Sequence, residues 1–393
     1  MRKHFCSSRI TSVSFTIRQP ETRQIALCFQ EINPTRRKRY KKSTFRGTYS
    51  RRLTTWQDGL MNSFPSRITV LAGGIGGARF LMGLLAHLHH ANPDGQGGTA
   101  TTVTVIGNTG DDIWVHGVRV CPDLDTVMYT LGDGISHERG WGREGETFSA
   151  KDELAAYGVE PTWFGLGDKD LATHLIRTQS LASGFTLTEV TAALCDRWQP
   201  GVTLLPMSNE RAETHVIVDD PDQGRIAIHF QEWWIRHRAA LPAHGFVLVG
   251  IEDARPAPGV LEAIHDTDLV IFPPSNPVVS IGTILQVPGI AEAVRTTKAP
   301  VIGLSPIVGG APVRGMADAC LTALNIETTA AAVALHYGAR SNGGFIDAWL
   351  VDTQDSESVG LLEQSGIRTK AIPLMMTDVD ATEAMAAHTL NFV

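Results

Sequence analysis

The stretch RITVLAGGIGGARFLMGLLAHLHH, residues 67–90, decides the fold. It opens with an apolar run that predicts a buried strand, followed by four glycines within five positions. Apolar residues then recur at the spacing of one helix face: Phe80, Leu81, Leu84, Leu85 and Leu88. A second strand-like run, TVTVIGN, fills residues 102–108. A strand, a glycine turn, a helix and a strand in this order predict an α/β fold with a Rossmann-like parallel sheet.

The rest of the chain extends this pattern with one interruption. Residues 147–200 read as helices with few strands between them, which predicts a helical insertion or cap. Strand-like runs then resume at VTLLPM (202–207), THVIVDD (214–220), RIAIHF (225–230), FVLVGI (246–251) and AWLVDT (348–353). We therefore expect one folded domain over residues 67–393.

Length and composition exclude several classes of protein. The 393 residues are 43% hydrophobic, enough for one large core or two domains. No apolar run reaches the roughly 18 residues of a membrane span. The 5 cysteines form no CxxC pair, so a zinc knuckle or a disulfide framework is not expected. A cytoplasmic location fits this composition.

Charge divides the chain into two parts. Residues 1–67 hold 15 of the 34 Lys and Arg residues but only 3 of the 41 acidic residues. We expect residues 1–66 to be a basic, disordered extension; an arm for nucleic acid or membrane surfaces and a targeting peptide are alternatives. A start codon assigned too far upstream is the favoured interpretation, with Met61 as the true start. Deleting residues 1–60 should then leave stability and activity unchanged.

The glycine turn resembles a phosphate-binding turn. Gly73, Gly74, Gly76 and Gly77 lack side chains where a ligand would approach, and a helix N-terminus follows. The turn is not a P-loop, because no Lys-Ser/Thr pair follows it. It is not a dinucleotide fingerprint either, because Arg79 stands where the third glycine should be. A tight strand-to-helix turn without a ligand is the alternative.

Four aspartates follow the second strand, in NTGDDIWVHGVRVCPDLDT (108–126). Asp111, Asp112, Asp123 and Asp125 would repel one another unless a cation lies among them. Hard oxygen ligands suit Mg²⁺, which is commonly held by one or two carboxylates and substrate phosphates. The pattern thus predicts a magnesium site for a diphosphate. A solvated acidic loop is the alternative.

Three further segments carry polar groups with more than one interpretation. GLGDKDLATHLIRTQ (165–179) places Lys169, His174 and Arg177 near a helix start, either as a site or as plain surface. HFQEWWIRHR (229–238) holds a tryptophan pair that could stack a flat ring or fill the core. The SNP turn, Ser275, Asn276 and Pro277, could bind a base or phosphate or end a strand.

Seven motifs in order resemble one known family: GGIGGARFL, NTGDDIWVHG, CPDLDT, GDKDLATH, HFQEWW, PSNPVVSIG and SPIVGGAPVRGMAD. From about residue 67 to the C-terminus, the sequence is similar to the CofD/FbiA transferases of coenzyme F420 biosynthesis. RGWG (139–142) and HFQEWW look closest to the actinobacterial FbiA branch. The resemblance implies transfer of a phosphoenolpyruvyl group from enolpyruvyl-diphospho-guanosine to the ribityl hydroxyl of the deazaflavin Fo, releasing GMP.

The resemblance also implies roles for individual residues. Asp125 and Lys169 would be catalytic, and Mg²⁺ would be bound by the aspartates Asp111, Asp112, Asp123 and Asp125. The donor nucleotide and the acceptor would be bound by the glycine turn, Asn108, His174, Arg177 and the SNP turn. A homodimer is expected, with no nucleic-acid or membrane partner.

Two other functions stay open from the residues. A lactyl-diphospho-guanosine donor would make the protein a 2-phospho-L-lactate transferase. A related branch, a regulatory factor of gluconeogenesis that binds nucleotide sugars, shares the glycine turn but has no use for a deazaflavin. An NAD-dependent oxidoreductase is disfavoured by the broken glycine fingerprint.

Overall fold

The computed structural model describes residues 64–392. The chain divides into two units, Met1–Gln57 and Asp58–Val393, and the fold below is that of the second unit. The expected basic extension lies almost wholly outside the described residues, as does Met61. The role of that extension therefore stays a prediction.

Seven parallel strands form the central sheet in the order β14-β13-β10-β9-β1-β2-β5. Their bounds are β1 Arg67–Ala72, β2 Thr102–Gly107, β5 Thr203–Pro206, β9 Leu269–Phe272, β10 Val301–Leu304, β13 Ala348–Val351 and β14 Arg368–Ala371. The chain builds the sheet outward from β1 to β5, then returns to the other side of β1 at β9. This arrangement confirms the predicted Rossmann-like sheet. It also creates a switch point between β1 and β9, where ligands bind in such folds.

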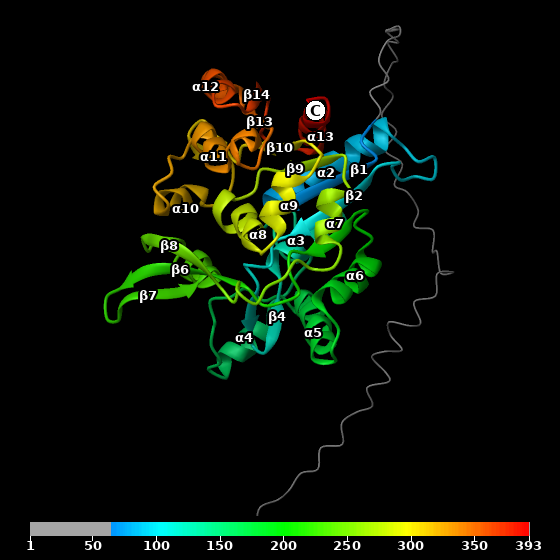
Figure 1. Ribbon diagram of the computed structural model, residues 1–393. Helices are drawn as coiled ribbons and strands as arrows, with labels where there is room; N and C mark the ends of the chain where they lie inside the picture. Colours follow the sequence, from blue (N-terminus) through cyan, green and yellow to red (C-terminus); the bar gives the residue numbers. More distant parts are fainter. Residues whose placement is uncertain (1–63, 393) are drawn as a thin grey trace, which may run out of the picture. The chain divides into compact units, whose positions relative to one another are not determined.

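Helices cover both faces of the sheet (Figure 1). Because successive side chains of a strand point to opposite faces, the strands contribute to two hydrophobic cores. Val70 packs toward one face and its neighbour Leu71 toward the other. The Val70 face is covered by α2 (Ile75–Ala91), α3 (Pro122–Leu131), α6 (Leu187–Trp198) and α13 (Val379–Leu390). The Leu71 face is covered by α7 (Val260–His265), α8 (Gly282–Gln286), α9 (Ile290–Thr296), α10 (Ala317–Ala323), α11 (Ala330–Tyr337) and α12 (Val359–Gln364).

The predicted helical segment contains three helices. α4 (Ser149–Ala156) and α5 (Asp168–Ala182) precede α6, which Thr186 and Glu189 start with a reciprocal capping box. α6 packs against β5 and α3, so it is an ordinary crossover helix of the sheet. α5 packs against the hairpin of β3 (Ile113–Val115) and β4 (Val118–Val120), so only α4 and α5 stand away from the sheet.

A second, antiparallel sheet projects from the connection between β5 and β9 (Figure 1). It has the order β7-β6-β8, with β6 at Glu213–Asp220, β7 at Gly224–His229 and β8 at Ala243–Val249. Three predicted strand-like runs therefore form strands that do not join the parallel sheet. The helical turn η1 (Glu232–Arg236) follows β7 and returns the chain toward the switch point.

The remaining short elements surround the ends of β9, β10 and β13. They are η2 (Pro277–Ile281), β11 (Ile307–Val308), β12 (Ala311–Pro312), η3 (Arg340–Asn342) and η4 (Thr353–Ser358). Among the described residues, no single helix is long and apolar enough to cross a membrane. One pair bent by 91°, Pro277–Gln286 with Ile290–Thr296, passes that test of length and composition together.

Candidate active site

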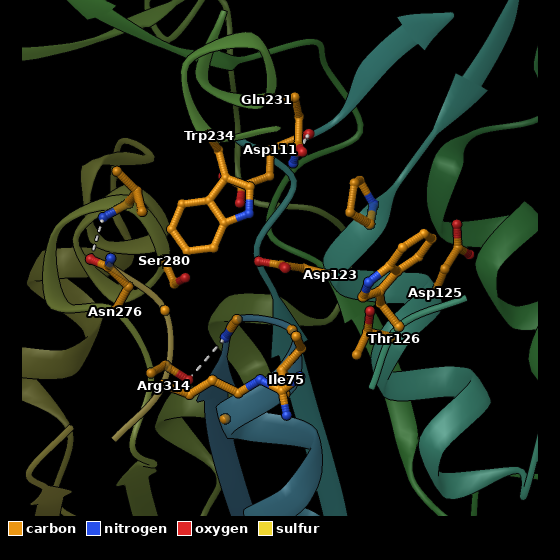
Figure 2. A pocket seen from close by; sticks show the side chains of 18 of the residues that line it. Ile75, Asp111, Asp123, Asp125, Thr126, Gln231, Trp234, Asn276, Ser280 and Arg314 are labelled. Atoms are coloured by element: carbon orange, nitrogen blue, oxygen red, sulfur yellow. Dashed lines mark hydrogen bonds between the residues drawn. The ribbon is translucent and has the colours of Figure 1, made fainter. Parts of the chain in front are cut away.

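A cavity of about 710 Å³ lies at the carboxyl ends of β1 and β9, at the switch point of the sheet (Figure 2). Segments far apart in the sequence line it: the glycine turn, the acidic loop and start of α3, the loop after α3, η1, the SNP turn and the loop after β12. Figure 2 shows Asp123, Ser280, Trp234 and Arg314 around this space. The fold therefore brings most of the predicted motifs to one place.

The glycines of the turn are required by protein contacts. A Cβ at Gly76 would lie 2.0 Å from the carbonyl oxygen of Pro274, which follows β9. At Gly73 it would lie 2.4 Å from the Ser280 Oγ, and at Gly74 it would lie 2.5 Å from the Asp123 Oδ1. The start of α2 is thus pressed against the β9 loop and α3. Close packing of the protein is sufficient to explain these glycines; Gly73, Gly74 and Gly76 also line the cavity, and the phosphate-binding role of the turn stays a prediction.

Gly76→Ala is expected to destabilise the protein by about 1–3 kcal/mol or more, because the backbone carbonyl of Pro274 cannot move aside as a flexible side chain could. Gly360→Ala on α12 is the matched control, since a Cβ there meets no atom within 4 Å. Denaturant unfolding of both variants tests the expectation. Equal stability of the two variants would contradict the packing argument.

Asp111 and Asp123 form a buried carboxylate pair bridged by one amide. The Asn108 Nδ2 donates hydrogen bonds of 3.2 Å to Asp111 Oδ1 and of 2.9 Å to Asp123 Oδ2. Asn108 is itself held, because its Oδ1 accepts the Gly110 N–H at 2.9 Å. Both carboxylates line the cavity, whereas Asn108 lies beneath them and is fully buried. Asn108 therefore does not line the cavity itself but holds the two aspartates in place by hydrogen bonds.

Burial makes ionisation of this pair unfavourable. It raises the pKa of Asp123 to about 7, with hydrogen bonding to Asn108 opposing the change. Burial, and then the charge of Asp123, raise the pKa of Asp111 well above its usual value. Among residues 64–392, no arginine or lysine forms an ion pair with either carboxylate. A divalent cation with oxygen ligands would relieve this repulsion, so the pair fits Mg²⁺.

The other two aspartates already have cationic partners. Asp112 lies outside the cavity lining and pairs with Arg119 at 2.9 Å. Asp125 pairs with the buried Arg177. In the described part of the chain, no group of three or more His, Cys, Asp and Glu residues is placed to hold a metal ion. The structure thus brings Asp111 and Asp123 together without a cationic partner among the described residues, whereas Asp112 and Asp125 are each paired with an arginine; a magnesium site of all four aspartates stays a prediction.

Asp125 belongs to a buried polar network. Arg177 contacts Asp125 Oδ1 through Nη2, and its Nη1 lies 3.1 Å from His174 Nδ1. The other ring nitrogen of His174 lies 3.4 Å from Asp170 Oδ2, and Asp170 Oδ1 accepts the Tyr129 hydroxyl at 2.6 Å. The Asp125 Oδ2 is buried without a hydrogen-bond partner and its residue lines the cavity. The network fixes one oxygen of Asp125, and the other oxygen lies 3.7 Å from His174 Nδ1.

The side chains of the GDKD motif and of the helix that follows it lie partly at the cavity and partly on the surface. His174 lines the cavity, whereas Arg177 lies behind it and contacts Asp125. Lys169 is exposed and absent from the cavity lining; its Nζ donates to the Glu144 carbonyl at 2.8 Å. The structure therefore does not place Lys169 where the predicted catalytic role needs it, because the first turn of α5 points that side chain outward.

The SNP turn lies against the glycine turn. Ser275 and Asn276 line the cavity, while Pro277 does not. The Ser275 Oγ accepts the Gly73 N–H at 3.3 Å, and the Asn276 Oδ1 accepts two N–H groups at the start of η2. The turn thus follows β9 and also forms one wall of the cavity, while its binding of a base or phosphate stays a prediction.

Some cavity residues were not identified from the sequence. The tryptophan pair splits: Trp233 is a core residue whose Nε1 donates to Leu241, and Trp234 lines the cavity. Further aromatic residues line the cavity without having been singled out as ligand contacts: Tyr129, Trp141, Trp163, Phe164 and Phe230. Three arginines also line it: Arg79, Arg139 and Arg314. Arg79 stood out in the sequence only as a break in a fingerprint, and nothing paired it with distant arginines.

Known proteins similar to this chain are transferases by name. Residues 68–391 match the family described as 2-phospho-L-lactate transferase CofD. A protein from Streptomyces griseus named phosphoenolpyruvate transferase is 62% identical over 83% of this chain and 98% of its own length. Proteins of the same name from Thermobifida fusca and Mycolicibacterium smegmatis are 59% and 57% identical, over 83% of this chain and 97% and 98% of theirs.

A solved structure supports the fold alone. The crystal structure of a UPF0052 family member from Bacillus halodurans covers 83% of this chain and 98% of that chain, with a TM-score of 0.51 at 17% identity. The family match, by contrast, spans nearly all of the described sequence, and the relatives match over almost their full lengths. This chain therefore belongs to the 2-phospho-L-lactate transferase CofD family.

Proposed function

We propose that this protein is a phosphoenolpyruvate transferase of coenzyme F420 biosynthesis. It would transfer the phosphoenolpyruvyl group of enolpyruvyl-diphospho-guanosine to the ribityl hydroxyl of the deazaflavin Fo and release GMP. The observation that carries the proposal is the shared name of relatives 57–62% identical to this chain over nearly their full lengths. The cavity at the switch point supports it, because acidic, cationic and aromatic groups meet there.

The cavity suits two flat, charged substrates. Its volume of about 710 Å³ lies within the range of small-molecule sites. Aromatic side chains such as Trp234 and Tyr129 line it, and a deazaflavin ring or a guanine base would stack on such faces. Ser275 and Asn276 would supply polar contacts to the nucleotide, beside the start of α2.

Asp125 would accept the proton of the attacking hydroxyl through its unpartnered Oδ2. The hydroxyl oxygen then forms a bond to the phosphorus that carries the enolpyruvyl group. The bond from that phosphorus to the oxygen of GMP breaks, and GMP keeps the electron pair. Arg177 would hold Asp125 in place throughout. Mg²⁺, held by Asp111 and Asp123, would neutralise charge on the diphosphate.

The proposal also includes three features that the resemblance implies. They are a homodimer, a cytoplasmic location, and small-molecule substrates without nucleic-acid or membrane partners. Lys169 keeps a role only if the segment around residue 169 rearranges when substrate binds.

Transfer can be tested with the full chain, Fo, Mg²⁺ and either the enolpyruvyl or the lactyl donor, with products identified by mass spectrometry. We expect faster transfer from the enolpyruvyl donor, loss of activity with a chelator and its return with Mg²⁺. Faster transfer from the lactyl donor would make the protein a 2-phospho-L-lactate transferase. No transfer from either donor, with binding of a uridine diphosphate sugar, would favour the regulatory alternative.

A further inference from the structure

Three arginines meet at the cavity from three separate parts of the chain. Arg79 lies on α2, Arg139 in the loop after α3, and Arg314 in the loop after β12. In the described range 64–392, none of the three forms an ion pair with a carboxylate. Three like charges gathered without a counter-charge repel one another, so the arrangement favours an anionic ligand.

The position of Arg314 is fixed by the RGWG segment. The Arg314 Nη2 donates to the carbonyl oxygen of Arg139 at 3.2 Å. A Cβ at Gly140 would lie 2.6 Å from the same nitrogen, and Gly140 has a φ of +73°, which L side chains rarely adopt. Gly140 therefore allows the guanidinium to rest on the backbone. The Arg314 guanidinium is thus held against the backbone of residues 139–140, and among the described residues no carboxylate pairs with it.

The other two arginines line the same cavity. The Arg139 guanidinium lies 5.5 Å from the Trp141 ring centroid and 5.6 Å from that of Phe148; its Nη2 donates to the Arg143 carbonyl at 2.8 Å, and its Nε is buried without a hydrogen-bond partner. Partial burial, followed by the charge of Arg79, lowers the pKa of Arg314. Arg79 and Arg314 are thus close enough to influence each other.

The cavity consequently contains two oppositely charged parts. The carboxylates Asp111 and Asp123 attract a metal ion with the diphosphate bound to it. Figure 2 draws Asp111 and Arg314 on opposite sides of Asp123 in its view. Besides its diphosphate, the proposed donor has one further anionic group, the carboxylate of its three-carbon acid. A guanidinium matches a planar carboxylate with two parallel hydrogen bonds.

We propose that Arg79, Arg139 and Arg314 form a carboxylate subsite that binds the three-carbon acid of the donor. This inference rests on the proposed function, because it takes the nature of the donor from there. The subsite would make the protein bind a guanosine diphosphate that carries a carboxylate more tightly than GDP itself.

Calorimetric titration with Mg²⁺ and without Fo tests the subsite, because donor binding is then measured without turnover. The ligands are enolpyruvyl-diphospho-guanosine and GDP, and the variants are Arg314→Gln and Arg79→Gln. We expect each variant to bind the donor about 10–100-fold more weakly and GDP with little change. Arg314→Lys, which keeps the charge without the planar fork, should lose less affinity than Arg314→Gln.

Arg225→Gln is the matched control, because Arg225 is an exposed arginine on β7 outside the cavity lining. Equal weakening of donor and GDP in the Arg314 and Arg79 variants would overturn the inference and assign the arginines to phosphate. Unchanged donor binding would also overturn it. Failure of the proposed function is distinguishable, because the unmodified protein would then fail to bind the donor.

Discussion

Asp125→Ala is expected to abolish transfer and also to destabilise the fold by about 3–5 kcal/mol, because it leaves Arg177 as an unpaired buried cation. Arg177 is 1% exposed, so water cannot solvate the charge that Asp125 now neutralises. The loss of this buried ion pair is therefore expected to weaken the fold as well as the chemistry. Single-turnover assays and denaturant unfolding measure the two effects separately.

Two companion variants separate chemistry from stability. Asp125→Asn keeps an oxygen that can accept from Arg177 but cannot accept the substrate proton, so it should be more stable than the alanine variant and equally inactive. Asp125→Ala combined with Arg177→Met removes both charges and should recover most of the lost stability without activity. A folded Asp125→Asn protein with near-normal turnover would refute the proposed proton acceptor.

Asp123→Asn is expected to have the opposite effect on stability while also abolishing Mg²⁺-dependent transfer. Asp123 repels Asp111 and has no cationic partner within residues 64–392, so an amide relieves an unfavourable charge. The Asn108 hydrogen bond can persist, because an asparagine oxygen still accepts it. Calorimetry with Mg²⁺ and activity assays should both show a loss, whereas thermal unfolding should show a rise in Tm of several degrees.

The stability gain should depend on pH. The pKa of Asp123 rises from about 4 in the unfolded chain to about 7 in the folded protein. The stabilising contribution of a raised pKa is fully present below the unfolded value and is lost as the pH rises through the folded value. Asp123→Asn should therefore match the unmodified protein near pH 4 and exceed it above about pH 7. A Tm difference that does not change with pH would contradict this origin.

The sequence was sufficient to predict the sheet. The turn at residues 73–77 and the helix after it repeat a local pattern whose geometry is fixed by strand and helix periods. The separate antiparallel sheet could not be predicted, because β6 and β8 have the same alternation as strands that join the main sheet. Only tertiary packing decides which partner a strand takes.

The position of the candidate site was predicted from the sequence, but the ion pairs of its charged residues were not. Asp111 and Asp123 follow from a spacing of acids after a strand. The pairing of Asp112 with Arg119 is made within the β3–β4 hairpin, and that of Asp125 with Arg177 joins α3 to α5; no spacing in the sequence shows either pair. The arginine subsite was missed for the same reason, since its members come from three distant segments.

The acidic loop is positioned by its backbone. The carbonyl of Gly110 accepts the Thr214 N–H at 2.7 Å, that of Asp111 accepts from Gln231 at 3.3 Å, and that of Asp112 accepts from His229 at 3.0 Å. Thr214 and His229 of the small sheet, together with Gln231 after it, thus hold the loop by hydrogen bonds to its backbone carbonyls. During divergence, the side chain at 111 can change while the backbone of the loop keeps its path, whereas Asp112 is tied to the buried Arg119.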